Sequence, residues 1–364
     1  MSPGEFLLAA VDLSRGGPSE SSGGGPPAWD EHETETFLRM ARHHRVEGLV
    51  LQRLASQTGP RIPAPIEEAL RRSFHGSKLR HVVFREEWIR IAGALRGRGI
   101  DCMPLKGIDI AHTLYPDPGI RPCDDIDLLV REGDAAAAGR ALRDLGYESP
   151  RTLLPPAIVK RFHFHLLVVH TAKQIPVEIH WGLMDRGEVS PRATQCVWDQ
   201  AQRDATGLFH MSPVTQAAYL AAHAGRHGVL SERIARDENA RSLVLHPFSG
   251  LRLIWFVDLY LAMTKHGLSS DDVLGAADAL GCRASAHETL TIGKAIFGGW
   301  PGPVPALDPA GREGWLEDRI KNRLVGRIQS EQRPDQPFRT ELPWVLTTNK
   351  RFHFRPIRLI GGRG

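Results

Sequence analysis

Residues 104–130 restrict the folds open to this chain more than the rest of its sequence does. A Lys-Gly turn at 106–107 follows a short apolar segment, a helical run covers 108–115, and a Pro/Gly loop leads into an acidic strand. In that strand Asp125 and Asp127 alternate with apolar residues, which places both aspartates on one face of a sheet, about 7 Å apart at Cα. Carboxylates at this spacing can converge on the hard divalent cations that handle phosphate groups.

The order of these motifs resembles the nucleotidyltransferase fold of the DNA polymerase β superfamily, and within it a family of uncharacterised bacterial nucleotidyltransferases. The resemblance extends over residues 35–290. The superfamily's common Gly-Ser turn is Gly107-Ile108 here, so no serine hydroxyl follows the glycine. The shared motifs are Leu105-Lys106-Gly107, Leu114-Tyr115, Pro118-Gly119-Ile120-Arg121, Asp125-Ile126-Asp127-Leu128-Leu129-Val130, Leu145-Gly146-Tyr147 and Val177-Glu178-Ile179-His180-Trp181.

This resemblance implies an α+β fold in which a small mixed sheet forms the nucleotidyltransferase core, with helical regions on its N- and C-terminal sides. It also implies Mg²⁺ (or Mn²⁺) held by Asp125, Asp127 and a third acid on a later strand. Glu178 is the natural third acid, because the other face of its predicted strand is apolar. Its expected role is metal ligand, general base for an acceptor hydroxyl, or both. The plain alternative is an outward-facing glutamate.

Four further residues are candidates for binding the phosphates or the substrate. Gly107 lets backbone amides approach a phosphate and Lys106 supplies a positive charge, although a solvated lysine in a strand-end turn is the plain alternative. Arg121 either contacts the triphosphate or pairs with Asp125. His180 is expected beside Glu178 on the active face.

The composition is that of an ordinary soluble globular protein. Of the 364 residues, 41% are hydrophobic and 24% charged, and the net charge of +4 permits an anionic partner without requiring nucleic acid. The four cysteines form no CxxC pair, so we expect a reduced, cytoplasmic setting. The N-terminus lacks the basic region of a signal peptide, and no apolar run approaches the roughly 20 residues of a membrane span.

Composition and periodicity divide the chain into five segments. We expect residues 1–29 to be flexible because 15–28 are rich in Gly, Ser and Pro, although 4–12 allow a short helix. Residues 1–28 and 351–364 are expected to lie outside the catalytic core. The other segments are an N-terminal helical region (30–98), the nucleotidyltransferase core (99–185), a C-terminal helical region (186–300) and a Pro/Gly-rich and basic tail (301–364).

Hydrophobic periodicity predicts the elements within these segments. Strands are expected over 101–105, 125–130, 162–170 and 175–181, the last two as a hairpin, with a loop over 233–246. Asp30 and Ser269 are expected to cap helices. Helices are expected over 30–44, 46–54, 65–96, 108–115, 135–145, 214–227, 248–266, 270–280, 283–297 and, weakly, 315–328.

Several histidines suggest a different site. A zinc site could draw on five of them, but 223–227 lacks the glutamate of the H-E-x-x-H metalloprotease signature. His165 and His223 are therefore expected to pack or hydrogen-bond near the active face. The histidines concerned are His163, His165, His180, His223 and His227.

Three functional hypotheses follow. The first is an enzyme that transfers a nucleoside monophosphate from an NTP to an acceptor, with release of pyrophosphate. The acceptor stays open among RNA, a protein or peptide, and a small molecule, and the oligomeric state is not determined. The second is a non-catalytic protein that keeps the fold and binds a nucleotide, an RNA or a peptide. The third is a zinc hydrolase that uses the histidines.

Overall fold

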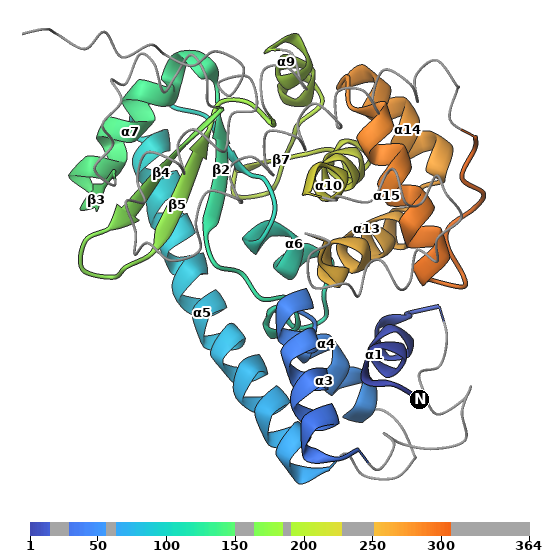
Figure 1. Ribbon diagram of the computed structural model, residues 1–364. Coiled ribbons are helices and arrows are strands. Elements are labelled where there is room, and N and C mark those ends of the chain that lie inside the picture. The colour runs from blue at the N-terminus through green and yellow to red at the C-terminus, as the bar shows by residue number, and fades with distance from the viewer. Residues whose placement is uncertain (15–28, 56–62, 150–163, 185–190, 228–250, 307–364) are drawn as a thin grey trace, which may run out of the picture.

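The computed structural model describes residues 1–14, 29–55, 63–149, 164–184, 191–227 and 251–306. Figure 1 shows a sheet with helix α5 and helix α7 on one side and a group of helices that includes α6, α10 and α13 on the other. The strands are β1 (Cys102–Pro104), β2 (Ile126–Val130), β3 (Tyr147–Glu148), β4 (His165–His170), β5 (Pro176–His180), β6 (Gln202–Arg203) and β7 (Phe209–His210). The helices are α1 (Pro3–Val11), α3 (Glu31–His44), α4 (Glu47–Ala55), α5 (Ala64–Arg96), α6 (Ile108–Thr113), α7 (Ala135–Asp144), α9 (Pro191–Asp199), α10 (Pro213–His227), α13 (Leu253–His266), α14 (Ser270–Ala279) and α15 (Arg283–Ile296), with short 3₁₀ turns at Pro118–Ile120 and Glu132–Asp134.

The main sheet is mixed, with the strand order β1-β2-β5-β4-β3. Strands β2 and β5 are parallel neighbours, whereas β1 pairs antiparallel with β2 and β4 pairs antiparallel with β5. The predicted hairpin over 162–181 is therefore confirmed for the residues described. So is the expected architecture, a small mixed sheet flanked by helical regions at both ends of the chain.

The two faces of the sheet have different partners because side chains alternate along each strand. One face packs against α5 and α7 in a continuous apolar cluster. The opposite face carries the aspartates, and there Leu129 joins the apolar cluster of the helical regions. The residues that pack on the first face include Ile126, Leu128, Val130, Val177 and Ile179 from the strands and Phe84, Trp88, Ile91, Leu95, Ala138 and Leu142 from the helices.

Helix α5 runs without interruption over 33 residues, so Gly76 does not break it. Its C-terminal half is amphipathic in the expected way, with Trp88 and Leu95 buried against the sheet. Leu79 and Val83, which the periodicity includes in the buried stripe, are instead 69% and 46% exposed. The helix has packing partners on both sides of these positions, since Leu70 before them and Phe84 after them are buried. Leu79 and Val83 are exposed because they lie on the opposite face of the helix from the buried His81.

The short helix that residues 4–12 allow is confirmed as α1, so residues 1–14 are not part of the flexible segment expected over 1–29. Helix α1 begins at a capping box made by Ser2 and Glu5 and buries Phe6 and Leu7 almost completely. The Phe6 ring packs edge-on against Phe37 of α3, with centroids 5.7 Å apart. An apolar stripe of this kind gains more from burial than the short chain loses in entropy. Residues 15–28 lie outside the described residues.

The C-terminal helical region follows the prediction closely where it is described. Ser212 begins α10 by accepting a hydrogen bond from the Thr215 amide at 3.4 Å, and Ser269 begins α14 with the expected capping box. Helix α13 begins at Leu253, five residues later than predicted. Helix α9 and the β6–β7 hairpin were not predicted. The expected loop at 233–246 and weak helix at 315–328 lie outside the described residues.

None of the helices in the described ranges combines the length and the apolar character needed to cross a bilayer.

Candidate active site

Three carboxylates meet on the helix-facing side of the sheet. Asp127 of β2 is the register partner of Glu178 on the parallel neighbour β5, so their side chains leave the sheet on the same face. Asp125 lies two residues before Asp127, immediately ahead of β2, and therefore points the same way. One carboxylate oxygen from each of the three residues lies within 4.8 Å of the others. The structure thus brings together the three acids that the sequence predicts.

Asp127 is the most deeply buried of the three, with 1% of its side chain exposed. Its Oδ1 atom accepts hydrogen bonds from Lys106 Nζ at 2.8 Å and from His180 Nε2 at 3.1 Å. Its Oδ2 atom is buried and has no hydrogen-bond partner among the described residues. A buried carboxylate oxygen without a partner is costly, which makes Oδ2 a natural ligand for a cation.

His180 links two of the acids. Its Nε2 atom lies 3.1 Å from Asp127 Oδ1 and 3.1 Å from Glu178 Oε2, and the ring is almost fully buried. Burial favours the neutral imidazole, but the hydrogen bonds to Asp127 and Glu178 outweigh it and raise the pKa of His180. His180 therefore lies beside Glu178 on the active face, as expected, and its Nε2 atom is engaged with the two acids.

The three carboxylates differ in how readily they ionise. The negative charge of Asp127, with burial in addition, raises the pKa of Asp125 to about 6. Burial would raise the pKa of Asp127 as well, but the Lys106 ammonium and the His180 hydrogen bond hold it below its usual range. The pKa of Glu178 is also lowered, because its hydrogen bond with His180 outweighs burial. A cation between these acids removes the repulsion that raises the Asp125 pKa.

The turn that precedes α6 requires glycine. Gly107 has φ +51°, and a Cβ atom there would lie 2.9 Å from the sulfur of Cys123. The turn brings Lys106 to Asp127, and burial of the ammonium is outweighed by the Asp127 charge, which raises the pKa of Lys106. The backbone hydrogen bonds at the start of α6 begin with the Asp109 amide, which donates to the Lys106 carbonyl at 3.1 Å, so the amides of Gly107 and Ile108 come before them. Helix α6 has only six residues, which limits what its dipole adds.

The phosphate-binding role expected of Arg121 is not supported, and neither is its pairing with Asp125. Its guanidinium donates to Asp258 of α13, with Nη2 2.8 Å from Oδ2, and both side chains are buried. Tyr115 Oη donates to the other oxygen of Asp258 at 2.6 Å. Since Arg121 and Asp258 are 137 residues apart, their spacing in the sequence gives no indication that they pair. Arg121 ties the loop before β2 to the C-terminal helical region.

Asp124, next to the acids, belongs to a different set of contacts. Its carboxylate pairs with Arg45 and with Arg80, the latter at 3.1 Å, and half of its side chain is exposed. Asp124 thus lies in the loop before β2 and is not a member of the group formed by the three acids. It also provides an aspartate in the same segment that can serve as a control.

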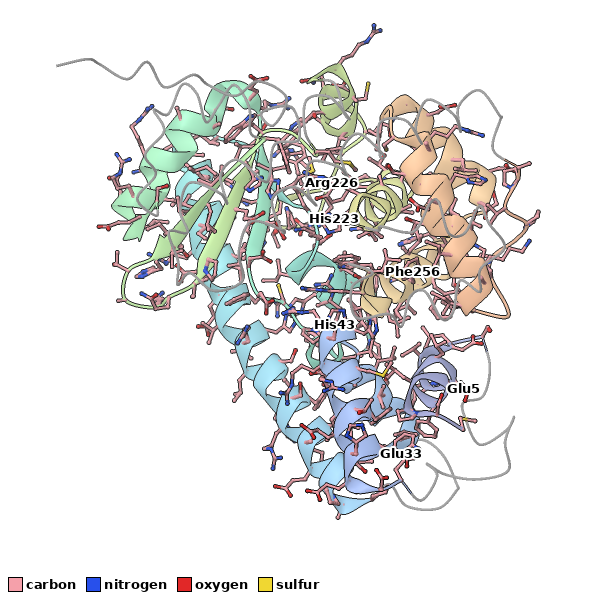
Figure 2. All side chains as sticks on the ribbon, in the orientation of Figure 1. Glu5, Glu33, His43, His223, Arg226 and Phe256 are labelled. Carbon is pink, nitrogen blue, oxygen red and sulfur yellow. The ribbon has the colours of Figure 1, made fainter. Side chains whose placement is uncertain are left out.

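Helix α10 brings toward the sheet two side chains that the sequence analysis did not single out, Tyr219 and Arg226, along with His223, which it did. Arg226 lies over the ring of Phe164 at 5.0 Å, and that ring lies 5.6 Å from the ring of His180. Burial raises the pKa of the Tyr219 phenol; the Lys106 charge opposes the rise, and the charge of Asp127 adds to it. Figure 2 shows His223 and Arg226 on the side of α10 that faces the sheet. Tyr219, His223 and Arg226 are spaced by four and then three residues, which places them on one face of the helix. That spacing alone does not reveal what the face packs against.

The five histidines are only partly brought together. His165 and His180 are register partners on β4 and β5, and with Glu178 they form a second group whose ligand atoms lie within 4.8 Å of one another. The ring of His223 instead packs against Trp255, with centroids 5.4 Å apart. His163 and the side chain of His227 lie outside the described residues.

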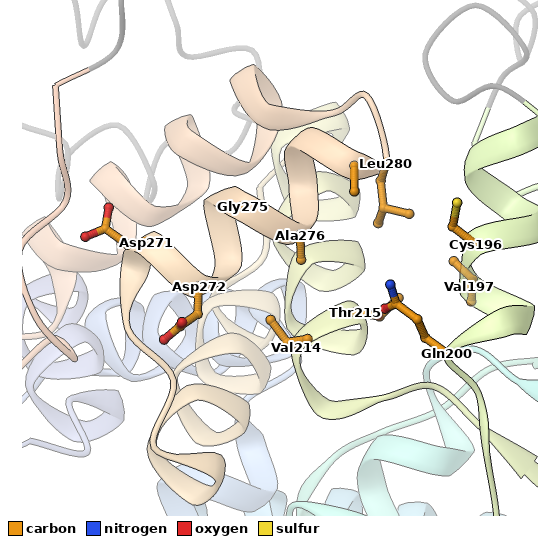
Figure 3. A pocket seen from close by; sticks show the side chains of 11 residues that line it. Cys196, Val197, Gln200, Val214, Thr215, Asp271, Asp272, Gly275, Ala276 and Leu280 are labelled. Carbon is orange, nitrogen blue, oxygen red and sulfur yellow. Dashed lines mark hydrogen bonds between the residues drawn. The ribbon is translucent and has the colours of Figure 1, made fainter.

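A pocket of about 420 Å³ lies away from the acids, between α9, α10 and α14 (Figure 3). Its walls combine apolar and polar side chains, and two of the polar groups satisfy each other, since Thr215 Oγ1 donates to Gln200 Oε1 at 2.9 Å. None of the acids of the cluster lines it. Its lining residues are Cys196, Val197, Gln200, Val214, Thr215, Asp271, Asp272, Gly275, Ala276, Ala279 and Leu280.

A mixed sheet with three converging acids on one face and helices flanking it defines an α+β protein of the nucleotidyltransferase class. Comparison with known families agrees: the model of a family described as "uncharacterised nucleotidyltransferase" matches residues 30–298, well over half of the chain. The chain belongs to this uncharacterised nucleotidyltransferase family. No curated protein and no solved structure matches it.

Proposed function

We propose that this protein is a metal-dependent nucleotidyltransferase that moves a nucleoside monophosphate from an NTP to an acceptor hydroxyl. The new bond forms between the acceptor oxygen and the α-phosphorus, the bond to the bridging oxygen breaks, and pyrophosphate leaves. The observation that carries this proposal is the convergence of Asp125, Asp127 and Glu178, together with the buried and unpartnered Asp127 Oδ2 in the described part of the chain. Membership of a nucleotidyltransferase family supports the same class of reaction.

The residues present fit Mg²⁺ or Mn²⁺, because three carboxylates supply the hard oxygen ligands that such ions prefer. Asp125, Asp127 and Glu178 would hold the ion. When bound, the ion neutralises charge on the phosphates. The need for several carboxylate ligands around one ion explains why Asp125 and Asp127 lie close together although their charges repel each other.

The side chains around the acids have separable roles in this proposal. Lys106 keeps its charge beside Asp127 and offers its remaining donors to the phosphates, with the amides of Gly107 and Ile108. Glu178 takes the proton of the acceptor hydroxyl. His180 holds Asp127 and Glu178 at a fixed separation. Arg226 and Tyr219 approach the site from α10, across from the strands that carry the acids.

The transfer reaction can be tested without knowing the acceptor. The purified protein is incubated with Mg²⁺, a cell extract and each labelled NTP in turn, and the labelled product is isolated. We expect the wild-type protein to transfer label and Asp127→Asn to lose transfer, because asparagine keeps the shape but not the charge. Asp124→Asn is the matched control and should transfer normally, since its exposed ion pairs contribute only about 0–1 kcal/mol. Wild-type transfer by a folded Asp127→Asn protein would refute the assignment.

A further inference from the structure

A second group of ligand atoms lies on the same sheet face, one strand further from the aspartates. His165 on β4 is directly opposite His180 on β5, and Glu178 precedes His180 by two residues. All three side chains therefore leave the sheet on the same side. The two imidazole rings lie 5.1 Å apart between centroids and are inclined by 31°.

The donor atoms of this group are already close to the separation that one ion imposes. His180 Nε2 is 3.1 Å from Glu178 Oε2, and His165 Nε2 is 4.0 Å from Glu178 Oε1. Ligands of one tetrahedral Zn²⁺, bound at about 2.0–2.2 Å, are separated by about 3.3 Å. The three side chains are between 3% and 20% exposed, so they are held by the sheet rather than free in solvent.

The chemistry of the donors differs from that of the aspartate group. Mg²⁺ prefers oxygen ligands, whereas imidazole nitrogen suits Zn²⁺ and neighbouring transition metals. Two imidazoles and one carboxylate form a ligand set known for Zn²⁺ when a further position is filled by water or a substrate. Mg²⁺ therefore gains no preferred ligand at the histidine group compared with the aspartate group. A transition metal gains two nitrogen ligands there.

We propose that His165, Glu178 and His180 form a second cation site, selective for Zn²⁺-like ions, and that its occupant withdraws Glu178 and His180 from the aspartate group. The two groups share Glu178, and His180 Nε2 hydrogen-bonds to both acids. An ion on that nitrogen displaces the proton that His180 shares with Asp127, because one nitrogen cannot carry a proton and coordinate a metal at once. This site goes beyond the proposed transfer reaction and requires no nucleotide.

Binding of Co²⁺ tests the site directly, because its visible absorption reports nitrogen ligands. Full-length protein stripped with a chelator is titrated with Co²⁺ alone. We expect one absorbing Co²⁺ per chain in the wild type. His165→Gln should weaken this binding by more than the 10- to 100-fold that loss of an outer-sphere partner costs. Glu178→Gln, at a more exposed position, should also weaken Co²⁺ binding. The melting temperature of each variant is measured to establish that it folds.

Two variants serve as controls for the position of the bound Co²⁺. Asp125→Asn removes an acid of the neighbouring group only and should keep the Co²⁺ absorption. His210→Gln removes a histidine that lies, like His180, between two carboxylates, those of Asp109 and Asp204, and should also keep it. Unchanged Co²⁺ absorption in folded His165→Gln, or its equal loss in Asp125→Asn, would overturn the proposed site. Neither outcome depends on whether the protein transfers nucleotides.

The sharing of Glu178 is tested by competition. Adding Mg²⁺ in excess to the Co²⁺ complex should reduce the absorption of the wild-type protein, because both ions require Glu178. Asp125→Asn binds Mg²⁺ less well, so the same Mg²⁺ should displace less Co²⁺ from it. Equal displacement in the two proteins, or none in the wild type, would show that the two ions do not compete for a shared ligand.

Discussion

Asp127 differs from Asp258, another deeply buried aspartate, in how its oxygens are satisfied. One Asp127 oxygen accepts from Lys106 and His180, and the other is buried without a partner in the described part of the chain. Both oxygens of Asp258 are satisfied, by Arg121 and Tyr115. This difference supports the proposal that Asp127 belongs to a binding site, whereas Asp258 makes a structural contact.

Lys106 should contribute to NTP binding through its charge. Lys106→Ala is expected to raise the dissociation constant of a non-hydrolysable NTP with Mg²⁺ by roughly 10- to 150-fold, since a hydrogen bond to a charged group contributes about 1.5–3 kcal/mol. Lys106→Arg should restore only part of the affinity, because a planar guanidinium does not replace a compact ammonium. Isothermal titration calorimetry measures both.

Lys78→Ala is the control for that experiment. Lys78 pairs with Asp117 and is half exposed, so its loss should leave NTP affinity unchanged. Equal affinity in the wild type and Lys106→Ala would mean that the phosphates are held without the ammonium.

Among the elements, α5 is joined to the sheet by a buried acid in addition to its apolar face. Glu87 accepts from Tyr147 Oη at 2.7 Å and from Lys173 Nζ at 2.6 Å, and it also pairs with Arg90. Although burial opposes ionisation, these hydrogen bonds lower the pKa of Glu87 to about 2. The contact joins the helix to the edge strand β3 and to the turn after β4, so it resists separation of α5 from the sheet.

Glu87 therefore predicts a specific acid dependence of stability. Its pKa is lower in the folded than in the unfolded protein, so its stabilising contribution is complete above about pH 4.5 and is lost as the pH falls toward 2. Glu87→Gln should lower the free energy of unfolding at pH 7 by up to about 3 kcal/mol. In urea titrations, the difference in the free energy of unfolding between wild type and Glu87→Gln should decrease as the pH falls from about 4.5 toward 2. Exposed Glu86→Gln is the control, and a pH-independent gap would contradict the assignment.

The elements were largely predictable from the sequence, and the reasons are local. Apolar spacing, the caps at Asp30 and Ser269 and the alternation in β2 are properties of neighbouring residues. The acidic cluster was predicted from the Asp-x-Asp pattern together with the family resemblance, which implies a third acid on a later strand and so led to Glu178. Helix α9 was missed because its apolar face is short and begins at Pro191 after residues that carry no clear signal.

In the molecule as a whole, contacts between distant segments could not be predicted from the sequence. Arg121 was interpreted from its neighbours, whereas its partner Asp258 lies in α13. The approach of Arg226 to Phe164 likewise depends on how α10 is placed against the sheet. Such pairings follow from the packing of whole elements, which periodicity within one element does not determine.

The contacts of the N-terminus with distant segments were likewise not predicted from the sequence, and they lead to a testable prediction. Deleting residues 1–14 should destabilise the whole protein, because α1 is packed into the core and the Asp12 carboxylate accepts from the Gly298 amide at 3.3 Å. Leu7→Ala should alone lower the free energy of unfolding by about 2–5 kcal/mol. Leu79→Ala, at a position 69% exposed, should change it by no more than about 0.5 kcal/mol. Equal effects of the two substitutions in urea denaturation would contradict the packing of α1.

If the three acids form a divalent-cation site that binds an NTP, the affinity of the protein for nucleotide must depend on Mg²⁺. Calorimetric titration of a non-hydrolysable NTP, with Mg²⁺ and with chelator, is compared across wild type, Asp125→Asn and the control Asp124→Asn. We predict that Mg²⁺ strengthens binding in the wild type and in Asp124→Asn, and that this gain disappears in Asp125→Asn while the melting temperature does not fall. A wild-type affinity that is the same with and without Mg²⁺, or a full Mg²⁺-dependent gain in Asp125→Asn, would contradict the proposed site.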